Sequence, residues 1–204
     1  MNRVSITAAS MVTAADLASA RPGQRFGRLD LSSQLSLLAV ESLKMDFNEF
    51  ARNRVGICLA TSAGSLSTDV NFWQGRNGVG GPSPTLFAYT LPSAAVGEIA
   101  IHYKLTGPNL CFVGDDQPVL PEAVDLIRRG AADGCVCVFS EVVSADLAKI
   151  ISLPPAAAAW AVFLKRGDGL REWREFDRDM KALCALISQT KSAVKSLCKS
   201  QPTN

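Results

Sequence analysis

The chain has 204 residues, of which 48% are hydrophobic and 20% are charged, a composition typical of one globular domain that buries a core. Its 21 basic and 19 acidic residues give a formal net charge of +2, so the charge gives no support for nucleic-acid binding. The sequence contains no run of about 18 apolar residues, so no membrane span is expected. We therefore expect a cytoplasmic protein.

Strand and helix patterns alternate along the first part of the chain. Residues 4–12 alternate as in a strand, and the apolar residues of 29–43 recur at helical spacing. Residues 54–61 form a short continuous apolar run, which is typical of a strand buried on both faces. The glycine and proline residues of 77–84 predict a surface loop near a partner or pocket.

The middle of the chain predicts a further helix, strand and helix. Residues 90–103 are mostly small and favour a helix, and residues 110–113 predict the next buried strand. Pro118 and Pro121 fit only the first turn of a helix, where a missing N–H is not needed. We expect that helix to end at Gly130.

Residues 134–140 predict another strand buried on both faces. Residues 156–164 and 170–176 predict a final strand pair around the turn at 166–169. Strands that alternate with helices indicate an α/β fold with a mainly parallel sheet.

The last predicted element is an amphipathic helix. Its apolar residues recur at steps of three and four: Met180, Leu183, Ile187, Thr190, Val194 and Leu197. Lys191, Lys195 and Lys199 line its polar face. This spacing fits a helix that packs on the chain's own sheet, and it also fits a helix that joins a second chain.

The cysteines and the single histidine give no support for a disulfide framework or a metal site. Cys58, Cys111, Cys135 and Cys137 all lie in predicted buried strands, so we expect reduced core thiols. His102 is the only histidine and no CxxC pair is present, so we expect no metal site.

Several motifs follow one another in order along the chain, at 27–39, 54–64, 90–92, 107–109 and 127–133. Together they resemble the N-terminal half of the β-ketoacyl synthases, over roughly residues 3–165. The resemblance implies a thiolase-like fold, here one half of an αβαβα sandwich with a mainly parallel five-stranded sheet. It also implies a division into a ketosynthase-like domain at 1–176, a C-terminal amphipathic helix at 177–199 and a disordered tail at 200–204.

The turn that would carry the family's nucleophilic cysteine is degenerate. It contains Cys111, Gly114, Asp115, Asp116 and Gln117, and it is a few residues shorter than the resemblance implies. Counting forward from the Gly-Pro pair places Asp116 at the nucleophile's position, and counting back from Gly130 places Val113 there. Gln117 is the residue type that inactive chain-length factors commonly carry.

No residue of this turn is expected to be catalytic. Cys111 belongs to the preceding strand, so its side chain should point into the sheet layers and away from a helix N-terminus that would activate a thiol. Asp115 and Asp116 can act as helix caps, or as paired carboxylates in acid–base chemistry. The family's two histidines come from a C-terminal half that this chain lacks.

The resemblance therefore implies a non-catalytic accessory subunit, similar to chain-length factors, of a fatty-acid or polyketide-type system such as an aryl-polyene pathway. It would need no cofactor and would bind a ketosynthase or an acyl carrier protein as a homo- or hetero-oligomer. Lys191, Lys195 and Lys199 could contact an acidic carrier protein, or could form a solvated face. The alternative is an acyl transferase or hydrolase that uses Asp115 or Asp116 with Ser93 or Ser140.

One half of the fold alone would expose the inner helical layer, and a large apolar face is a liability in a monomer. A second copy, a partner ketosynthase or the helix predicted from Met180 would have to cover this face.

Overall fold

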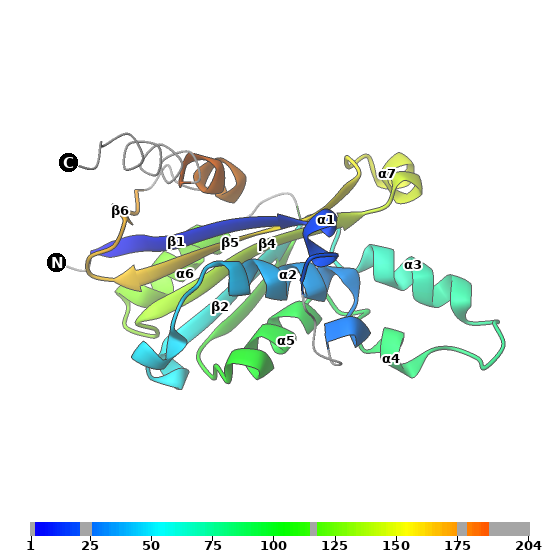
Figure 1. Ribbon diagram of the computed structural model, residues 1–204, viewed down its shortest axis with the longest axis horizontal. Helices are drawn as coiled ribbons and strands as arrows, with labels where there is room; N and C mark the ends of the chain where they lie inside the picture. The colour runs from blue at the N-terminus through cyan, green and yellow to red at the C-terminus, as the bar shows by residue number, and fades with distance from the viewer. Residues whose placement is uncertain (1–2, 21–25, 115–117, 175–178, 188–204) are drawn as a thin grey trace, which may run out of the picture.

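The computed structural model describes residues 3–20, 26–114, 118–174 and 179–187 (Figure 1). The helices are α1 (Ala14–Leu17), α2 (Leu31–Ser42), α3 (Leu66–Gly75), α4 (Pro84–Phe87), α5 (Ala94–Tyr103), α6 (Val119–Arg128) and α7 (Ala145–Ile151). The strands are β1 (Val4–Thr13), β2 (Val55–Thr61), β3 (Asn109–Val113), β4 (Gly134–Val143), β5 (Ala156–Arg166) and β6 (Arg171–Glu172). Short 3₁₀ turns lie at Phe26–Arg28, Phe47–Glu49 and Arg52–Arg54. Residues 180–187 form a last helical segment, here called the C-terminal helix.

The strands form one six-stranded sheet in the order β3-β2-β4-β5-β1-β6. β2 runs parallel to β3 and β4, whereas β5 runs antiparallel to both β4 and β1. Strands β1 to β4 therefore point in one direction, and the predicted α/β fold with a mainly parallel sheet is confirmed. The two-residue β6 is added to the five strands that the resemblance implied.

The predicted final strand pair is wrong in its pairing. β6 pairs with β1 through Ser5 opposite Glu172 and Ile6 opposite Arg171, and not with β5. Both edges of β5 are already occupied by β4 and β1, so the returning chain can add only to the outer edge of β1. The described strand is also shorter than the predicted 170–176, and residues 175–176 lie outside the described part of the chain.

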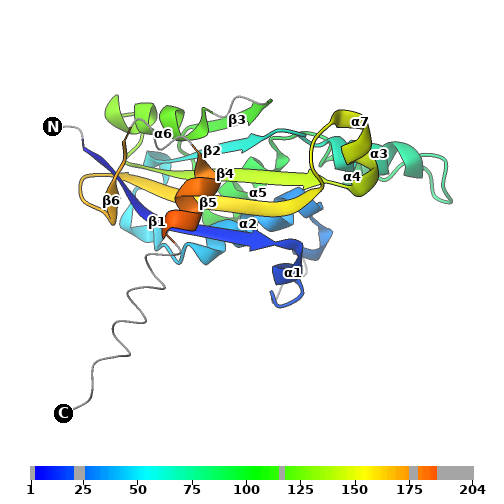
Figure 2. The same cartoon turned by 90° about the horizontal axis from the view of Figure 1, so that it is seen from above.

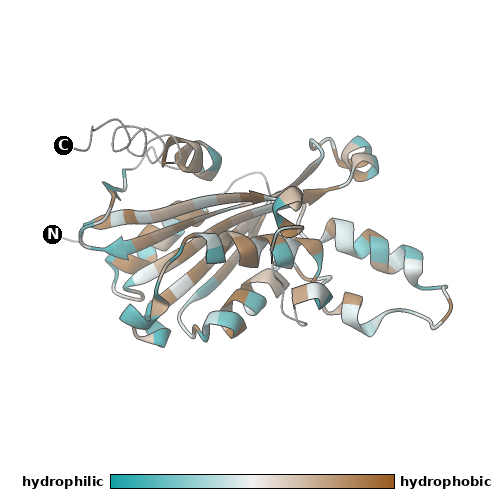
Figure 3. Cartoon of the chain, in the orientation of Figure 1, coloured by the Kyte–Doolittle hydropathy of each residue, from teal (hydrophilic) through white to brown (hydrophobic). Residues whose placement is uncertain are grey.

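Helices cover both faces of the sheet (Figures 1 and 2). α2 and α5 pack on one face, and α6 and the C-terminal helix pack on the other. The side chains of β4 alternate between these layers: Cys135, Cys137 and Phe139 pack with α6, and Val136 and Val138 pack with α2 and α5. This two-sided burial explains the continuous apolar run, and Figure 3 shows dense hydrophobic colouring along the strands.

Close packing of the chain before β3 against β2 explains the Gly107-Pro108 motif. A Cβ atom on Gly107 would lie 2.2 Å from the carbonyl oxygen of Val55, so only glycine fits there. The backbone N–H of Ile57 donates to the carbonyl of Pro108 at 2.8 Å. This close approach starts β3 directly beside β2.

An ion pair between Arg54 and Asp133 lies where β2 and β4 begin. The guanidinium of Arg54 donates to both carboxylate oxygens of Asp133 at 2.8 and 3.0 Å, and to the carbonyl of Gly130 at 2.7 Å. The hydrogen bonds from Arg54 lower the pKa of Asp133. These interactions of Arg54 therefore connect the starts of β2 and β4 with the end of α6.

Two elements of the structure differ from the prediction, one in where it begins and one in its burial. The helix predicted over 90–103 begins only at Ala94, because Pro92 lacks an N–H and restricts the residue before it. The strand predicted as buried at 110–113 is an edge strand, paired only with β2, and Val113 is 58% exposed.

The C-terminal helix packs on the chain's own sheet, on the same face as α6. Met180, Leu183, Cys184 and Ile187 are all at most 7% exposed, and Asp179 caps the helix by accepting from the N–H groups of the two residues that follow Met180. The Nζ atom of Lys181 lies 4.8 Å from the ring of Phe139 and 5.1 Å from that of Trp160, in the range of cation–π contacts. The remainder of the predicted helix and tail lies outside the described residues: Thr190, Val194, Leu197, Lys191, Lys195, Lys199 and residues 200–204.

Of the four cysteines expected to be core thiols, Cys58, Cys135 and Cys137 are free and buried, whereas Cys111 is free but only half-buried. Cys184, on the C-terminal helix, is also free and buried. Burial raises the pKa of Cys184 to about 12, so this thiol is unreactive while the C-terminal helix is docked. Among the described residues, no helix combines the length and the apolar character needed to cross a membrane.

We predict that Leu183→Asp detaches the C-terminal helix from the sheet. Leu183 is 3% exposed, and loss of this packing together with the cost of a buried charge should lower the free energy of unfolding by about 2–5 kcal/mol. Urea unfolding measures this change, and mass-spectrometric mapping of thiol labelling should detect faster modification of Cys184.

Leu186→Asp is the matched control because Leu186 lies on the same helix but is 48% exposed. It should change stability by no more than about 0.5 kcal/mol. Equal effects of the two substitutions would contradict the docking of this helix.

Candidate functional site

The candidate site lies where the parallel strands β2 and β3 end. Thr61, the last residue of β2, pairs with Val113, the last residue of β3. The carboxyl ends of parallel strands are the usual ligand-binding edge of an α/β sheet. The degenerate turn predicted from the sequence follows directly from this edge.

A buried carboxylate fixes the turn that follows β2. Glu141, on β4 and 7% exposed, accepts hydrogen bonds from the Thr61 hydroxyl at 3.0 Å and from the backbone N–H groups of Ser62 and Ala63 at 3.0 and 3.1 Å. Three donors satisfy the charge of a carboxylate in this position. Sequence reasoning missed Glu141, although a charged residue within an apolar strand run was the available signal.

The turn after β2 packs against the end of β3. Gly64 has a φ of +62°, and a Cβ atom there would lie 3.3 Å from Pro92 and 3.4 Å from Val113. The N–H of Gly114 donates to the carbonyl of Thr61 at 3.2 Å. Glu141 therefore positions the backbone beside the residues that lead into the degenerate turn.

The sheet separates Cys111 from α6. The half-buried Cys111 packs with the layer of α2 and α5, whereas α6 lies on the other face. Burial raises the pKa of the Cys111 thiol, which opposes formation of the nucleophilic thiolate. This thiol therefore lies away from the N-terminus of α6.

The centre of the predicted turn, Asp115, Asp116 and Gln117, lies outside the described residues. α6 begins at Val119, with Pro118 in the N-cap position and no side-chain cap on that residue. Pro121 lies in the first helical turn, as expected. The capping by Asp115 or Asp116 stays a prediction.

The serines of the alternative, enzymatic hypothesis are poorly placed among the described residues. Ser140 is fully buried, with its hydroxyl 3.1 Å from that of Ser32. Ser93 precedes the first residue of α5, and His102 lies near the last. Ser93 and His102 are nine residues apart, which corresponds to roughly 13 Å along the helix axis. His102 is therefore not a base for Ser93.

One small recess lies at this edge. The recess between the start of α2, the turn after β2 and residues 89–95 has a volume of about 10 Å³, enough for about one water molecule. Asp30 lies at its side, where its carboxylate accepts from the N–H of Ser33 and from the hydroxyl of Thr68, both at 3.0 Å.

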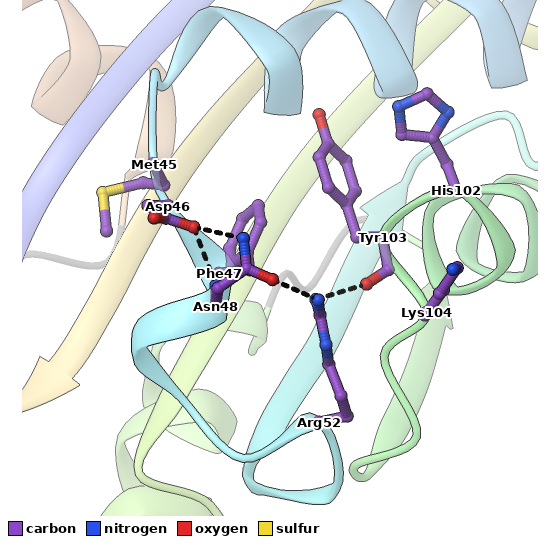
Figure 4. A pocket seen from close by; sticks show the side chains of 8 residues that line it. All are labelled: Met45, Asp46, Phe47, Asn48, Arg52, His102, Tyr103 and Lys104. Atoms are coloured by element: carbon purple, nitrogen blue, oxygen red, sulfur yellow. Dashed lines mark hydrogen bonds between the residues drawn. The ribbon is translucent and has the colours of Figure 1, made fainter.

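A larger cavity of about 270 Å³ lies near the start of β2 and the end of α5 (Figure 4). Met45, Asp46, Phe47, Asn48, Arg52, His102, Tyr103 and Lys104 line it. The rings of Phe47 and Tyr103 meet edge to face at 4.8 Å, and burial with the nearby Glu41 raises the pKa of Tyr103 to about 12. His102 therefore belongs to this cavity, which sequence reasoning did not predict.

Comparison with known proteins gives matches to ketosynthases. No protein-family model matches the chain. The 3-oxoacyl-[acyl-carrier-protein] synthase 2 of Staphylococcus aureus is 26% identical over 120 residues, in a match that covers 53% of this chain and 29% of that protein. The matched region thus spans less than a third of this relative.

Two solved structures share the fold. The ishigamide ketosynthase/chain length factor has a TM-score of 0.64 at 18% identity, covering 83% of this chain and 64% of that chain. The ketosynthase ApeO in complex with its chain length factor ApeC, from Xenorhabdus doucetiae, gives a TM-score of 0.59 at 19% identity, covering 83% and 81%. The chain therefore has the thiolase-like fold of the ketosynthases, as the resemblance implied.

We predict that Glu141→Gln destabilises the turn after β2. Glutamine keeps one acceptor oxygen but replaces the other with an NH₂ group, which cannot accept the hydrogen bond that Glu141 accepts from the N–H of Ser62. Loss of a hydrogen bond to a charged group costs about 1.5–3 kcal/mol, which urea unfolding should detect. Glu172→Gln is the control, because the side chain of Glu172 is 55% exposed and should contribute less than about 1 kcal/mol. Equal losses would disprove the anchoring role of Glu141.

Proposed function

We propose that this chain is a non-catalytic accessory subunit, similar to chain-length factors, of a fatty-acid or polyketide-type biosynthetic system. The proposal rests mainly on the placement of Cys111, which β3 directs away from α6. Cys111 is the only cysteine between Cys58 and Cys135. Condensation by covalent catalysis needs an activated nucleophile at this turn, so the retained scaffold suits binding rather than condensation.

A ketosynthase is the partner that we propose. The alignment with the ApeO–ApeC complex covers 83% of this chain and 81% of the matched chain, so a chain of similar length and fold is found in a ketosynthase complex. The resemblance to short ketosynthase-like proteins of aryl-polyene pathways supports such a pathway as the specific system.

The arm formed by residues 66–91, which contains α3 and α4, offers a surface for that partner. It projects from the body of the molecule in Figure 1, and Trp73, Phe87 and Leu91 are 61–64% exposed. Asp69 and Arg76 are its only charged residues, and the guanidinium of Arg76 lies 3.7 Å from the Trp73 ring centroid. Exposed aromatic residues with few charges are typical of the core of an interface.

The open edge of β3 continues this surface. β3 is an edge strand, and its last residue, Val113, contacts the turn from which the arm begins. An unpaired strand edge offers N–H and C=O groups to a second chain. We therefore propose that the partner covers the β3 edge and the arm together.

The remaining parts of the proposal rest on the sequence. An acyl carrier protein could contact Lys191, Lys195 and Lys199, since its acidic surface would complement these lysines. A cytoplasmic location fits the free buried thiols, which a reducing compartment preserves. We also propose the division of the chain into a ketosynthase-like domain at 1–176, a C-terminal helix at 177–199 and a tail at 200–204.

We predict that Trp73→Asp and Phe87→Asp each weaken co-purification with a full-length ketosynthase of the same organism. A charge in the centre of an apolar interface should weaken binding at least about tenfold, without a change in thermal stability because both side chains are exposed. Leu170→Asp is the control, since Leu170 is 63% exposed but lies in the β5–β6 connection. Undiminished binding by the arm variants would refute this interface.

We also predict that no acyl adduct forms on this chain. Intact-mass measurement after incubation with acyl-CoA or with an acylated carrier protein should give an unchanged mass. A stable adduct would instead support the acyl transferase or hydrolase. Asp116→Cys should not restore condensation, because the turn is shorter than in active enzymes; measurable condensing activity in that variant would contradict this interpretation.

A further inference from the structure

The cavity at the end of α5 is separate from the surface proposed for the ketosynthase. It lies beside the residues that precede β2, whereas the arm and the degenerate turn lie beyond the opposite ends of β2 and β3. Figure 4 shows Arg52 between Asn48 and Tyr103, with His102 and Lys104 beyond Tyr103. Three basic side chains from two segments of the chain therefore line one space.

The guanidinium of Arg52 is held in place by neutral acceptors. It donates to the carbonyl of Tyr103 at 2.7 Å and to the side-chain oxygen of Asn48. The carboxylate of Asp46 accepts from the backbone and side-chain nitrogens of Asn48, at 2.9 and 2.8 Å, so Asn48 separates it from Arg52. Within the described part of the chain, Arg52 has a fixed position and forms no ion pair.

Lys104 has a backbone conformation that favours glycine. It lies at the end of α5 with φ 56° and ψ 36°, and its N–H group donates to the carbonyls of Ala100 and Ile101. The side chain contributes nothing to this cap, so a glycine would make the same hydrogen bonds with less strain. Lys104 therefore places a positive charge at the cavity from a position where a glycine would be less strained.

We propose that this cavity binds a phosphate group, as inorganic phosphate or as a phosphate monoester, through Arg52, His102 and Lys104. The planar fork of Arg52 can contact two phosphate oxygens, and the ammonium of Lys104 adds a second positive charge. Three donors on separate side chains suit a tetrahedral anion better than a planar carboxylate. Of the acidic residues that the structure describes, Asp46 also lines the cavity and Glu41 lies near Tyr103. The cavity volume of about 270 Å³ suits a small ligand.

The test is a titration of the ¹⁵N-labelled full chain with inorganic phosphate and with methyl phosphate, at constant ionic strength and with chloride as the reference anion. Amide resonances of residues 45–52 and 102–104 should shift with saturation. Tighter binding of methyl phosphate would assign the site to a monoester, and tighter binding of inorganic phosphate would assign it to the free anion. Shifts no larger than those produced by chloride would overturn the proposal.

Lys104→Gly is the decisive variant, because it removes the charge while relieving the backbone. Affinity should fall about tenfold, as expected for loss of one charged contact, while thermal stability is kept or raised. Lys44→Gly is the matched control, since Lys44 has a similar φ of 57° but does not line the cavity. Equal loss of affinity in both variants would show a general effect of charge and would overturn the site.

Arg52→Gln provides a second variant that keeps a donor for the Tyr103 carbonyl. It should also bind about tenfold more weakly, with the fold checked by the unchanged amide spectrum of the sheet. Wild-type affinity in this variant would exclude the guanidinium as a ligand for the phosphate. These results do not depend on whether a ketosynthase binds the chain.

Discussion

The central strands present apolar side chains to both sides of the sheet, so each side needs a layer of helices. Along β4, Cys135, Cys137 and Phe139 face one layer, and Val136 and Val138 face the other. Full burial of a large apolar side chain contributes about 1.5–3 kcal/mol, while a whole domain is stable by only about 5–15 kcal/mol. An uncovered face would therefore exhaust the stability of the fold, which is why the C-terminal helix beside α6 is important.

The motifs that carry the resemblance to ketosynthases have structural reasons in this chain. Gly107 permits the close approach of β3 to β2, and Arg54 with Asp133 joins the starts of two strands. Glu141 holds the turn after β2 from within β4. These contacts stabilise the scaffold of this chain and do not require a catalytic turn after Val113. They explain how the same scaffold can form although the turn after Val113 differs in sequence from that of the ketosynthases. For this reason, the function is argued from that turn and from the exposed surfaces rather than from the fold.

Sequence reasoning recovered the elements whose pattern is local. The continuous apolar runs at 54–61 and 134–140 predicted doubly buried strands, since two helical layers demand that pattern. The pairing of β6 was not predictable, because it depends on which strand edges remain free after folding. The exposure of β3 and the cavity near Arg52 likewise arise from tertiary contacts between distant segments. At the candidate site, the strand position of Cys111 could be predicted, but the anchoring by Glu141 could not be read from local pattern alone.

The order of strands in the sheet also sets the order of events during synthesis. β1 is made well before its partners β5 and β6, and Val4 pairs with Arg166. At about 5–20 residues per second, the ribosome needs roughly 10–30 s to supply that partner. Until then, the apolar β1 has neither of its native neighbours. The sheet is therefore completed only after β5 and β6 have been made, and β1 is the strand that most needs protection by a chaperone until then.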